Sequence, residues 1–107
     1  MSVEHLTVST RSANDSWLVA LAGAVDLASR QLFLSALDEA AARSEGAVVL
    51  DMTSVSFMGS TALHGLVRLQ RTLRDQRRDL RLVAVHEAVL MPLRITGLDV
   101  EFAIRAP

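Results

Sequence analysis

The sequence predicts an α/β domain in which helices pack on a mixed sheet of four to five strands. Three observations support this fold class. The run that follows Gly46 is short, apolar and rich in β-branched residues, as in a strand buried on both faces. Amphipathic stretches at helical spacing precede and follow it, and further strand-like runs lie near both ends of the chain. The strand–helix–strand order implies parallel neighbours joined by a right-handed crossover.

Composition excludes several classes of protein. With 107 residues, we expect residues 1–107 to form one domain with its own core. The absence of cysteine rules out disulfides, thiolate metal sites and cysteine nucleophiles. A formal net charge of −1 argues against general nucleic-acid binding. No run approaches the ~20 apolar residues of a membrane span, so we expect a cytoplasmic protein without membrane insertion.

The first third of the chain predicts a hairpin and a helix. Val3–Thr10 alternates in polarity like an edge strand, and a turn at Asn14 leads into Trp17–Ala24. Because both faces of this second run are apolar, we expect it in the interior of the sheet. Leu27–Arg43 carries apolar residues at helical spacing, and Gly46 ends that helix.

The middle of the chain predicts a strand, a loop and a second long helix. Ala47–Asp51 is the strand, and the carboxylate of Asp51 is expected to hold a polar loop over residues 53–56 through backbone N–H groups. Phe57 and Met58 are expected to return the chain to the core. The helix covers Thr61–Arg78, with an inner stripe of Leu63, Leu66, Val67, Gln70 and Leu73 and an outer stripe of His64, Arg68, Arg71, Asp75 and Arg78.

The last third predicts two strands around a third helix. Leu80–Val85 is a strand, and a helix runs from Glu87 to Gly97, whose glycine suits a left-handed cap with Leu98 packing beyond it. Pro92 is expected to break or kink this helix, since proline in a helix interior costs ~3 kcal/mol. Alternation from Val100 onward predicts the final strand.

The start of the second long helix carries the residues of greatest functional interest. Gly59, Ser60 and Thr61 place a glycine and two hydroxyls just before the helical pattern. A hydroxyl there usually caps backbone N–H groups, and one esterified with phosphate would set its charge against the positive helix end. The two roles are compatible, and the residues alone leave both open.

This junction resembles the phosphoacceptor motif of STAS domains in bacterial anti-sigma factor antagonists. That motif reads apolar-Asp-Ser-Ser/Thr-Gly-Leu, and residues 57–63 read FMGSTAL. Similar family segments occur in order at residues 21–26 (LAGAVD), 50–51 (LD) and 96–98 (TGL). By this resemblance Ser60 is the phosphoacceptor, with Thr61 as the less favoured alternative. The sequence departs from the motif at Gly59, where the family has an acid, and at Ala62, where it has glycine.

The resemblance implies a binding protein without enzymatic activity or cofactor. In this family the unphosphorylated protein binds an anti-sigma factor that is also a serine kinase, which frees the sigma factor; phosphorylation breaks the complex and a phosphatase restores it. ATP then belongs to the partner, and the protein is a monomer or weak dimer. Two alternatives remain: an unphosphorylated STAS subunit serving as a structural partner, for example of a lipid-transport ATPase, which Gly59 favours, and a small-ligand sensor.

Further candidate residues lie near the proposed phosphoacceptor. Asp26 directly precedes a helix and should cap it, while by resemblance it could also contact the partner. His64 and Arg68 follow Ser60 on one helix face, where they are either solvated or touch the phosphate or partner. The Arg68–Arg78 stripe is a solvated face or a docking edge for an acidic partner.

Ser60 and His64 lack an orienting third group and an oxyanion site, so we expect no hydrolase. His5 and His86 have no ligand-spaced companions, so we expect no metal site. The predicted partner-binding set is Asp26, Gly59, Ser60, Thr61, His64 and Arg68.

Overall fold

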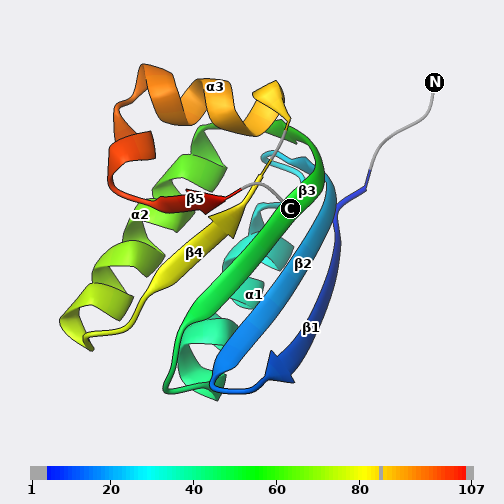
Figure 1. Ribbon diagram of the computed structural model, residues 1–107. Coiled ribbons are helices and arrows are strands. Elements are labelled where there is room, and N and C mark those ends of the chain that lie inside the picture. The colour runs from blue at the N-terminus through cyan, green and yellow to red at the C-terminus, as the bar shows by residue number, and fades with distance from the viewer. Residues whose placement is uncertain (1–4, 85, 106–107) are drawn as a thin grey trace.

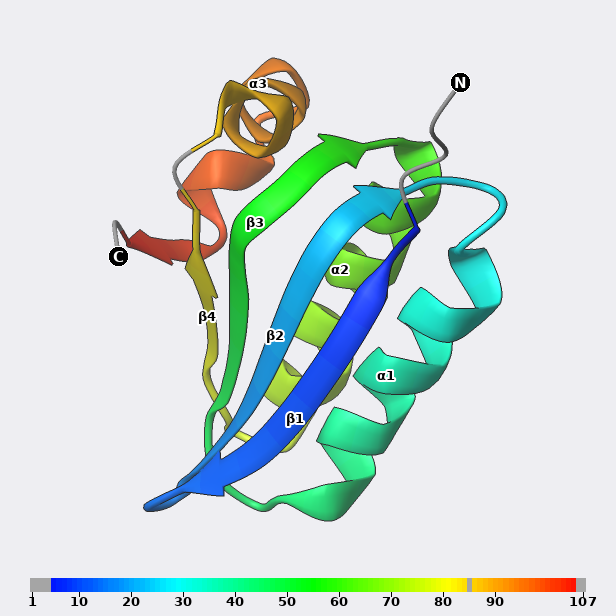
Figure 2. The ribbon, with the colours of Figure 1, turned by 90° about the vertical axis from the view of Figure 1, so that its right-hand side faces the viewer.

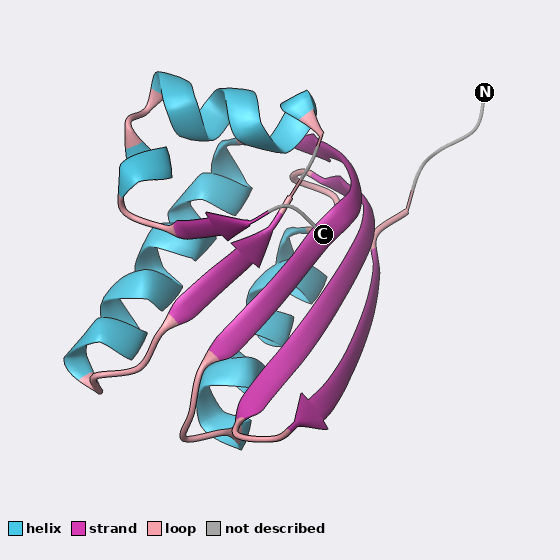
Figure 3. Cartoon of the chain, viewed as in Figure 1, coloured by secondary structure: helices cyan, strands magenta, loops and turns pink. Residues whose placement is uncertain are grey.

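The computed structural model describes residues 5–84 and 86–105 and contains a five-stranded sheet with two helices on one face and a third across one end (Figures 1 and 2). The strand order is β1-β2-β3-β4-β5; β1 and β2 are antiparallel and the other neighbours are parallel. The predicted α/β fold with a mixed sheet is confirmed (Figure 3). The strands are β1 (Thr7–Ala13), β2 (Ser16–Val25), β3 (Val48–Met58), β4 (Leu80–Val83) and β5 (Ala103–Arg105). The helices are α1 (Arg30–Arg43), α2 (Ser60–Asp75), α3 (Glu87–Ile95) and the 3₁₀ helix η1 (Leu98–Val100).

The first two strands form the predicted hairpin. Asn14 has a φ of 55°, the left-handed conformation that asparagine tolerates in a tight turn. The first strand lies later than predicted, since β1 spans Thr7–Ala13; Val3 and Glu4 lie outside the described residues. β2 pairs with β1 on one side and β3 on the other, so it lies in the interior of the sheet as predicted.

β3 is much longer than predicted. It continues past Asp51 to Met58, so the polar loop expected over residues 53–56 is wrong. The residues beyond Asp51 pair with β2 from Ala22↔Ser54 to Val25↔Met58. The register of the β2–β3 pairing is irregular at two points. The Asp51 carboxylate accepts bonds from the Thr53 N–H at 3.1 Å and the Thr53 hydroxyl at 2.8 Å, within the strand rather than at its end.

The core lies between the sheet and the pair α1–α2. Gly65 of α2 lets the two helices approach closely, because a Cβ at that position would lie 2.8 Å from the Phe33 ring of α1. The predicted inner stripe of α2 is correct for Leu66 and Leu73, which are buried, and for Leu63, which is half-buried and packs against the core; Val67 and Gln70 are only half-buried. The residues of α2 that are buried are Ala62, Gly65, Leu66, Leu69 and Leu73.

The third helix is not broken at its proline. α3 runs from Glu87 to Ile95 with Pro92 inside it, and the fully buried Val89 and Leu93 hold it on either side of the ring. Gly97 has the predicted left-handed conformation, with a φ of 76°, and Leu98 packs against the core beyond it. Val100 belongs to η1 and is 85 % exposed, so the predicted start of the final strand is wrong.

Candidate functional site

The proposed phosphoacceptor lies where β2 and β3 end side by side. Val25 and Met58 are paired neighbours at these ends, and the Gly59 N–H donates to the Val25 carbonyl at 3.0 Å. This bond ties the β3–α2 junction to the segment that follows β2. The topology therefore brings Ser60 and Asp26 to the same end of the sheet, although they lie far apart in the sequence.

The N-cap of α2 is Gly59, and Ser60 is its first helical residue. The expectation that the Ser60 hydroxyl caps the helix is therefore wrong. The Gly59 carbonyl accepts the N–H groups of Ala62 at 3.0 Å and Leu63 at 3.4 Å, but glycine has no side chain to bond the N–H groups of the first turn. None of the hydrogen bonds within the described part of the chain involves the Ser60 hydroxyl, and the residue is exposed. Its oxygen thus stands at the positive end of a 16-residue helix, open to chemical modification.

Asp26 caps the turn that leads into α1. Its Oδ1 accepts the Ser29 N–H at 3.1 Å, while the Asp26 N–H donates to Ser29 Oγ at 2.9 Å. This reciprocal pair has the geometry of a capping box. Ser29 Oγ also donates to the Ala24 carbonyl at 2.9 Å, which fixes the segment to β2. Asp26 therefore caps the turn before α1, whereas the N-cap of α1 itself is Ser29, so the prediction that Asp26 caps this helix directly is wrong.

Two large apolar side chains are exposed at this end of the sheet. Leu27 follows Asp26 and is 78 % exposed, and Phe57, near the end of β3, is 52 % exposed. The prediction that Phe57 returns to the core is wrong, whereas Met58 beside it is buried. Exposed apolar side chains mark a protein-binding surface where they form one contiguous patch.

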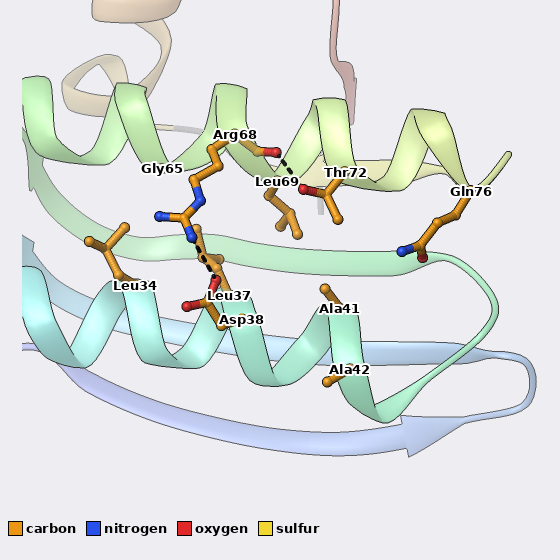
Figure 4. Close-up of a pocket in the computed structure, with 10 residues that line it drawn as sticks. All are labelled: Leu34, Leu37, Asp38, Ala41, Ala42, Gly65, Arg68, Leu69, Thr72 and Gln76. Atoms are coloured by element: carbon orange, nitrogen blue, oxygen red, sulfur yellow. Dashed lines mark hydrogen bonds and ion pairs between the residues drawn. The ribbon is translucent and has the colours of Figure 1, made fainter.

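Thr61, His64 and Arg68 lie together on the side of α2 that faces α1. With Arg30 and Leu34 of α1 and Gly65 they line a cleft of about 190 Å³, which Ser60 does not line. Arg30 was missed by the sequence reasoning because nothing in its local pattern relates it to α2. The cleft shares Leu34, Gly65 and Arg68 with a groove of about 350 Å³ between the two helices, where Arg68 lies 4.0 Å from Asp38 (Figure 4).

The described residues hold no group of three or more His, Cys, Asp or Glu side chains that could bind a metal ion. In the same residues, no helix combines the length and apolar character needed to cross a membrane.

Comparison with known proteins assigns the family. A model of the STAS domain family matches residues 7–106. The chain belongs to the STAS domain family. Its fold is similar to that of an anti-sigma factor antagonist from Mycobacterium paratuberculosis, at 25 % identity and a TM-score of 0.86, over 96 % of this chain and 86 % of the other. The anti-sigma factor antagonist SpoIIAA in its unphosphorylated form shares the fold at 14 % identity and a TM-score of 0.76, over 94 % and 89 % of the two chains. No curated protein sequence is significantly similar.

The glycine at the junction of this STAS domain is not required by the backbone. Gly59 has φ −91° and ψ −174°, an extended conformation that any residue adopts. A Cβ there would lie 3.4 Å from the Phe57 ring and 3.7 Å from the Val25 carbonyl oxygen, which are ordinary contacts. The backbone and its surroundings therefore accept a Cβ at residue 59, the position at which the family motif has an acid.

Proposed function

We propose that this STAS domain is an anti-sigma factor antagonist that binds a kinase-type anti-sigma factor through the Ser60 end of the sheet and is released by phosphorylation of Ser60. The observation that carries the proposal is the exposed Ser60 hydroxyl at the N-terminus of α2. The similarity to the anti-sigma factor antagonist from Mycobacterium paratuberculosis supports it. Sigma factors act on transcription in the cytoplasm, so we place the protein there, as a monomer or weak dimer.

The switch is electrostatic. A phosphate on Ser60 adds about −1.5 to −2 charges at the end of the sheet that also exposes Leu27 and Phe57, the apolar groups on which the partner would dock. Desolvating that charge against an apolar interface is costly, so the complex dissociates. Within the free chain, the unpaired N–H groups of the first turn and the helix dipole favour the same phosphate.

Each predicted residue has a place in this mechanism. The capping pair of Asp26 and Ser29 holds the Leu27 segment against the junction. Thr61, His64 and Arg68 line the adjacent cleft, where they contact the partner. The partner supplies the catalytic base and ATP, and a phosphatase reverses the reaction, so the chain itself has neither enzymatic activity nor a cofactor.

The test is the intact mass of the protein isolated from its native host, with a Ser60→Ala variant alongside. We expect a gain of one phosphate that disappears in Ser60→Ala. A phosphate that persists in this variant but is lost in Thr61→Val would move the acceptor to Thr61. If no phosphate appears under growth or stress while a kinase-type anti-sigma factor is present, the proposed switch is wrong.

The second candidate function is an unphosphorylated STAS subunit that serves as a structural partner, for example of a transport ATPase. Gly59 favours it, because the junction lacks the acid that the family motif places beside the reacting hydroxyl. A Gly59→Asp variant distinguishes the phosphorylated switch from the structural subunit. Strong phosphorylation of Gly59→Asp together with none of the parent chain would favour the structural subunit, whereas equal phosphorylation of both would support the switch.

A further inference from the structure

A basic groove lies along the C-terminal half of α2, away from Ser60. It has a volume of about 530 Å³, and its walls come from α2, the α2–β4 connection, β4, β5 and the residue after η1. Five arginines and two carboxylates line it, an excess of three positive charges in a chain whose formal net charge is −1. We call this the arginine groove; its lining residues are Gln70, Arg74, Arg77, Arg78, Asp79, Leu80, Arg81, Glu101 and Arg105.

The groove does not coincide with the Arg68–Arg78 stripe, which the sequence left open as a solvated face or a docking edge. Arg68 belongs to the α1 side of α2, where it faces Asp38, and Arg78 lies beyond the helix end and bonds to the carbonyls of Ala41 and Gly46. Among the arginines that line the groove, Arg74 is the one that belongs to α2. The fold therefore divides the predicted stripe into parts with different roles.

The arginines of the groove come from separate segments. Arg74 lies in the last turn of α2, Arg77 lies just beyond the helix with a φ of 57°, and Arg81 and Arg105 come from the strands β4 and β5. Attraction to the negative end of the α2 dipole accounts for Arg74 and Arg77, but it does not account for two further arginines on strands. Convergence from several elements indicates a recognition surface rather than a helix-end preference.

Within the described residues, ion pairs neutralise only part of the positive charge in the groove. Arg81 lies 3.7 Å from Asp79, an exposed pair worth little in stability. No ion pair joins Arg74, Arg77 or Arg105 to a carboxylate anywhere in residues 5–84 and 86–105. Their planar guanidinium groups are suited to bidentate bonds with carboxylates.

One wall of the groove is held by a hydrogen bond between distant segments. The Gln70 amide donates to the Glu101 carbonyl at 3.0 Å, which fixes the segment leading into β5 against α2. The Ala84 N–H donates to the Arg105 carbonyl at 3.0 Å and extends the β4–β5 pairing. These bonds fix the segments that carry Glu101 and Arg105, so the arginines are presented by a supported scaffold.

We propose that the arginine groove binds a short acidic segment of a protein partner, rich in Asp and Glu. Charge complementarity favours this occupant, and the bidentate geometry of arginine favours carboxylates. A nucleic acid is a poorer fit, because the chain outside the groove carries a net negative charge that repels a long polyanion. The proposal does not depend on phosphorylation of Ser60, since a helix rises about 1.5 Å per residue and Arg74 therefore lies about 21 Å from Ser60.

The test is a titration of the ¹⁵N-labelled full chain with an acetylated hexaglutamate peptide at low salt, followed by NMR. We expect saturable shifts of the backbone and Nε–H signals of Arg74, Arg77, Arg81 and Arg105, and weaker binding as salt is added. Arg74→Gln combined with Arg77→Asn should weaken the affinity about tenfold. Asparagine is chosen at residue 77 because it tolerates the left-handed conformation.

The matched control is Arg43→Gln, which also removes an arginine from the last turn of a helix but lies outside the groove. It should leave the affinity unchanged. Shifts spread evenly over all exposed arginines, Arg11 and Arg30 included, or an equal loss of affinity in Arg43→Gln, would overturn the proposal. Tighter binding of a hexathymidylate than of hexaglutamate at the same residues would exclude the acidic protein segment as occupant. Urea unfolding of the double variant should match that of the parent chain, which separates lost binding from lost folding.

Discussion

Arg78 is the side chain whose loss should most weaken the fold at the end opposite Ser60. Its Nε donates to the Gly46 carbonyl at 2.9 Å, and Nη1 donates to the Ala41 carbonyl at 2.9 Å. It also bonds Gln76 Oε1 at 2.7 Å and Ser44 Oγ at 2.9 Å. Arg78→Ala removes all four bonds and unties the C-terminal end of α1 from the α2–β4 connection. Counting about 1 kcal/mol for each half-buried bond to a carbonyl and less for the others, we expect a loss of about 2–3 kcal/mol in the free energy of unfolding.

The assay is urea unfolding followed by the fluorescence of Trp17, the only tryptophan of the chain, which is half-buried in β2. Arg78→Lys keeps the positive charge but lacks the several N–H donors of the planar guanidinium group. It should therefore lose most of the free energy of unfolding that Arg78→Ala loses. The matched control is Arg43→Ala, which breaks an exposed pair with Glu39 at 3.6 Å and should cost less than about 0.5 kcal/mol. If Arg78→Ala destabilises the chain no more than this control does, the structural role assigned to Arg78 is wrong.

Three further predictions follow from the structure. Gly65→Ala should destabilise the chain by about 1–3 kcal/mol in urea unfolding, because the added methyl would lie 2.8 Å from the Phe33 ring and force α1 and α2 apart; unchanged stability would show that the helices can separate freely. Gly59→Asp should raise the free energy of unfolding by a few tenths of a kcal/mol, since aspartate is a better N-cap than glycine and fits the extended backbone; a loss would contradict that fit. The hydrogen bond from Arg94 lowers the pKa of Glu87, so the pair stabilises α3 at neutral pH, and this contribution is lost as the pH falls below the usual glutamate range and through the lowered pKa. An NMR titration of the Glu87 carboxyl group should show the lowered pKa, and Arg94→Gln should return it to the ordinary range.

The fold class can be predicted from the sequence because the apolar residues of each long element recur with a regular spacing. The apolar spacing of α1 and α2 and the two-sided apolar character of β2 depend only on near neighbours along the chain. The extension of β3 does not follow in the same way. Past Asp51 the strand pairs with β2 through two register irregularities, so buried Val55 and Met58 are not spaced by two residues. A pattern of period two cannot be recognised there, and the segment looks like a polar loop.

The errors at helix ends have a different cause. Whether Gly59 or Ser60 is the N-cap depends on the backbone dihedral angles at one residue, and both residue types are acceptable caps. Pro92 is accepted inside α3 because burial of Val89 and Leu93 offsets the lost backbone hydrogen bond, which is a tertiary effect. The family motif directs attention to Ser60, and the structure exposes this residue at the N-terminus of α2, while its phosphorylation stays a prediction. The exposed Leu27 and Phe57 and the convergence of Arg81 and Arg105 with α2 required the structure.

The two ends of α2 both favour anionic ligands, for different electrostatic reasons. The N-terminal end is positive, its cap Gly59 supplies no carboxylate, and it therefore favours a phosphate on Ser60. The C-terminal end is negative and is surrounded by arginines, which in turn attract carboxylates. Screening limits charge interactions between exposed groups to about 8 Å at physiological ionic strength, far less than the ~21 Å that separates Ser60 from Arg74 along the helix. A phosphate on Ser60 should therefore leave the affinity of the arginine groove unchanged, and release of one partner need not release the other.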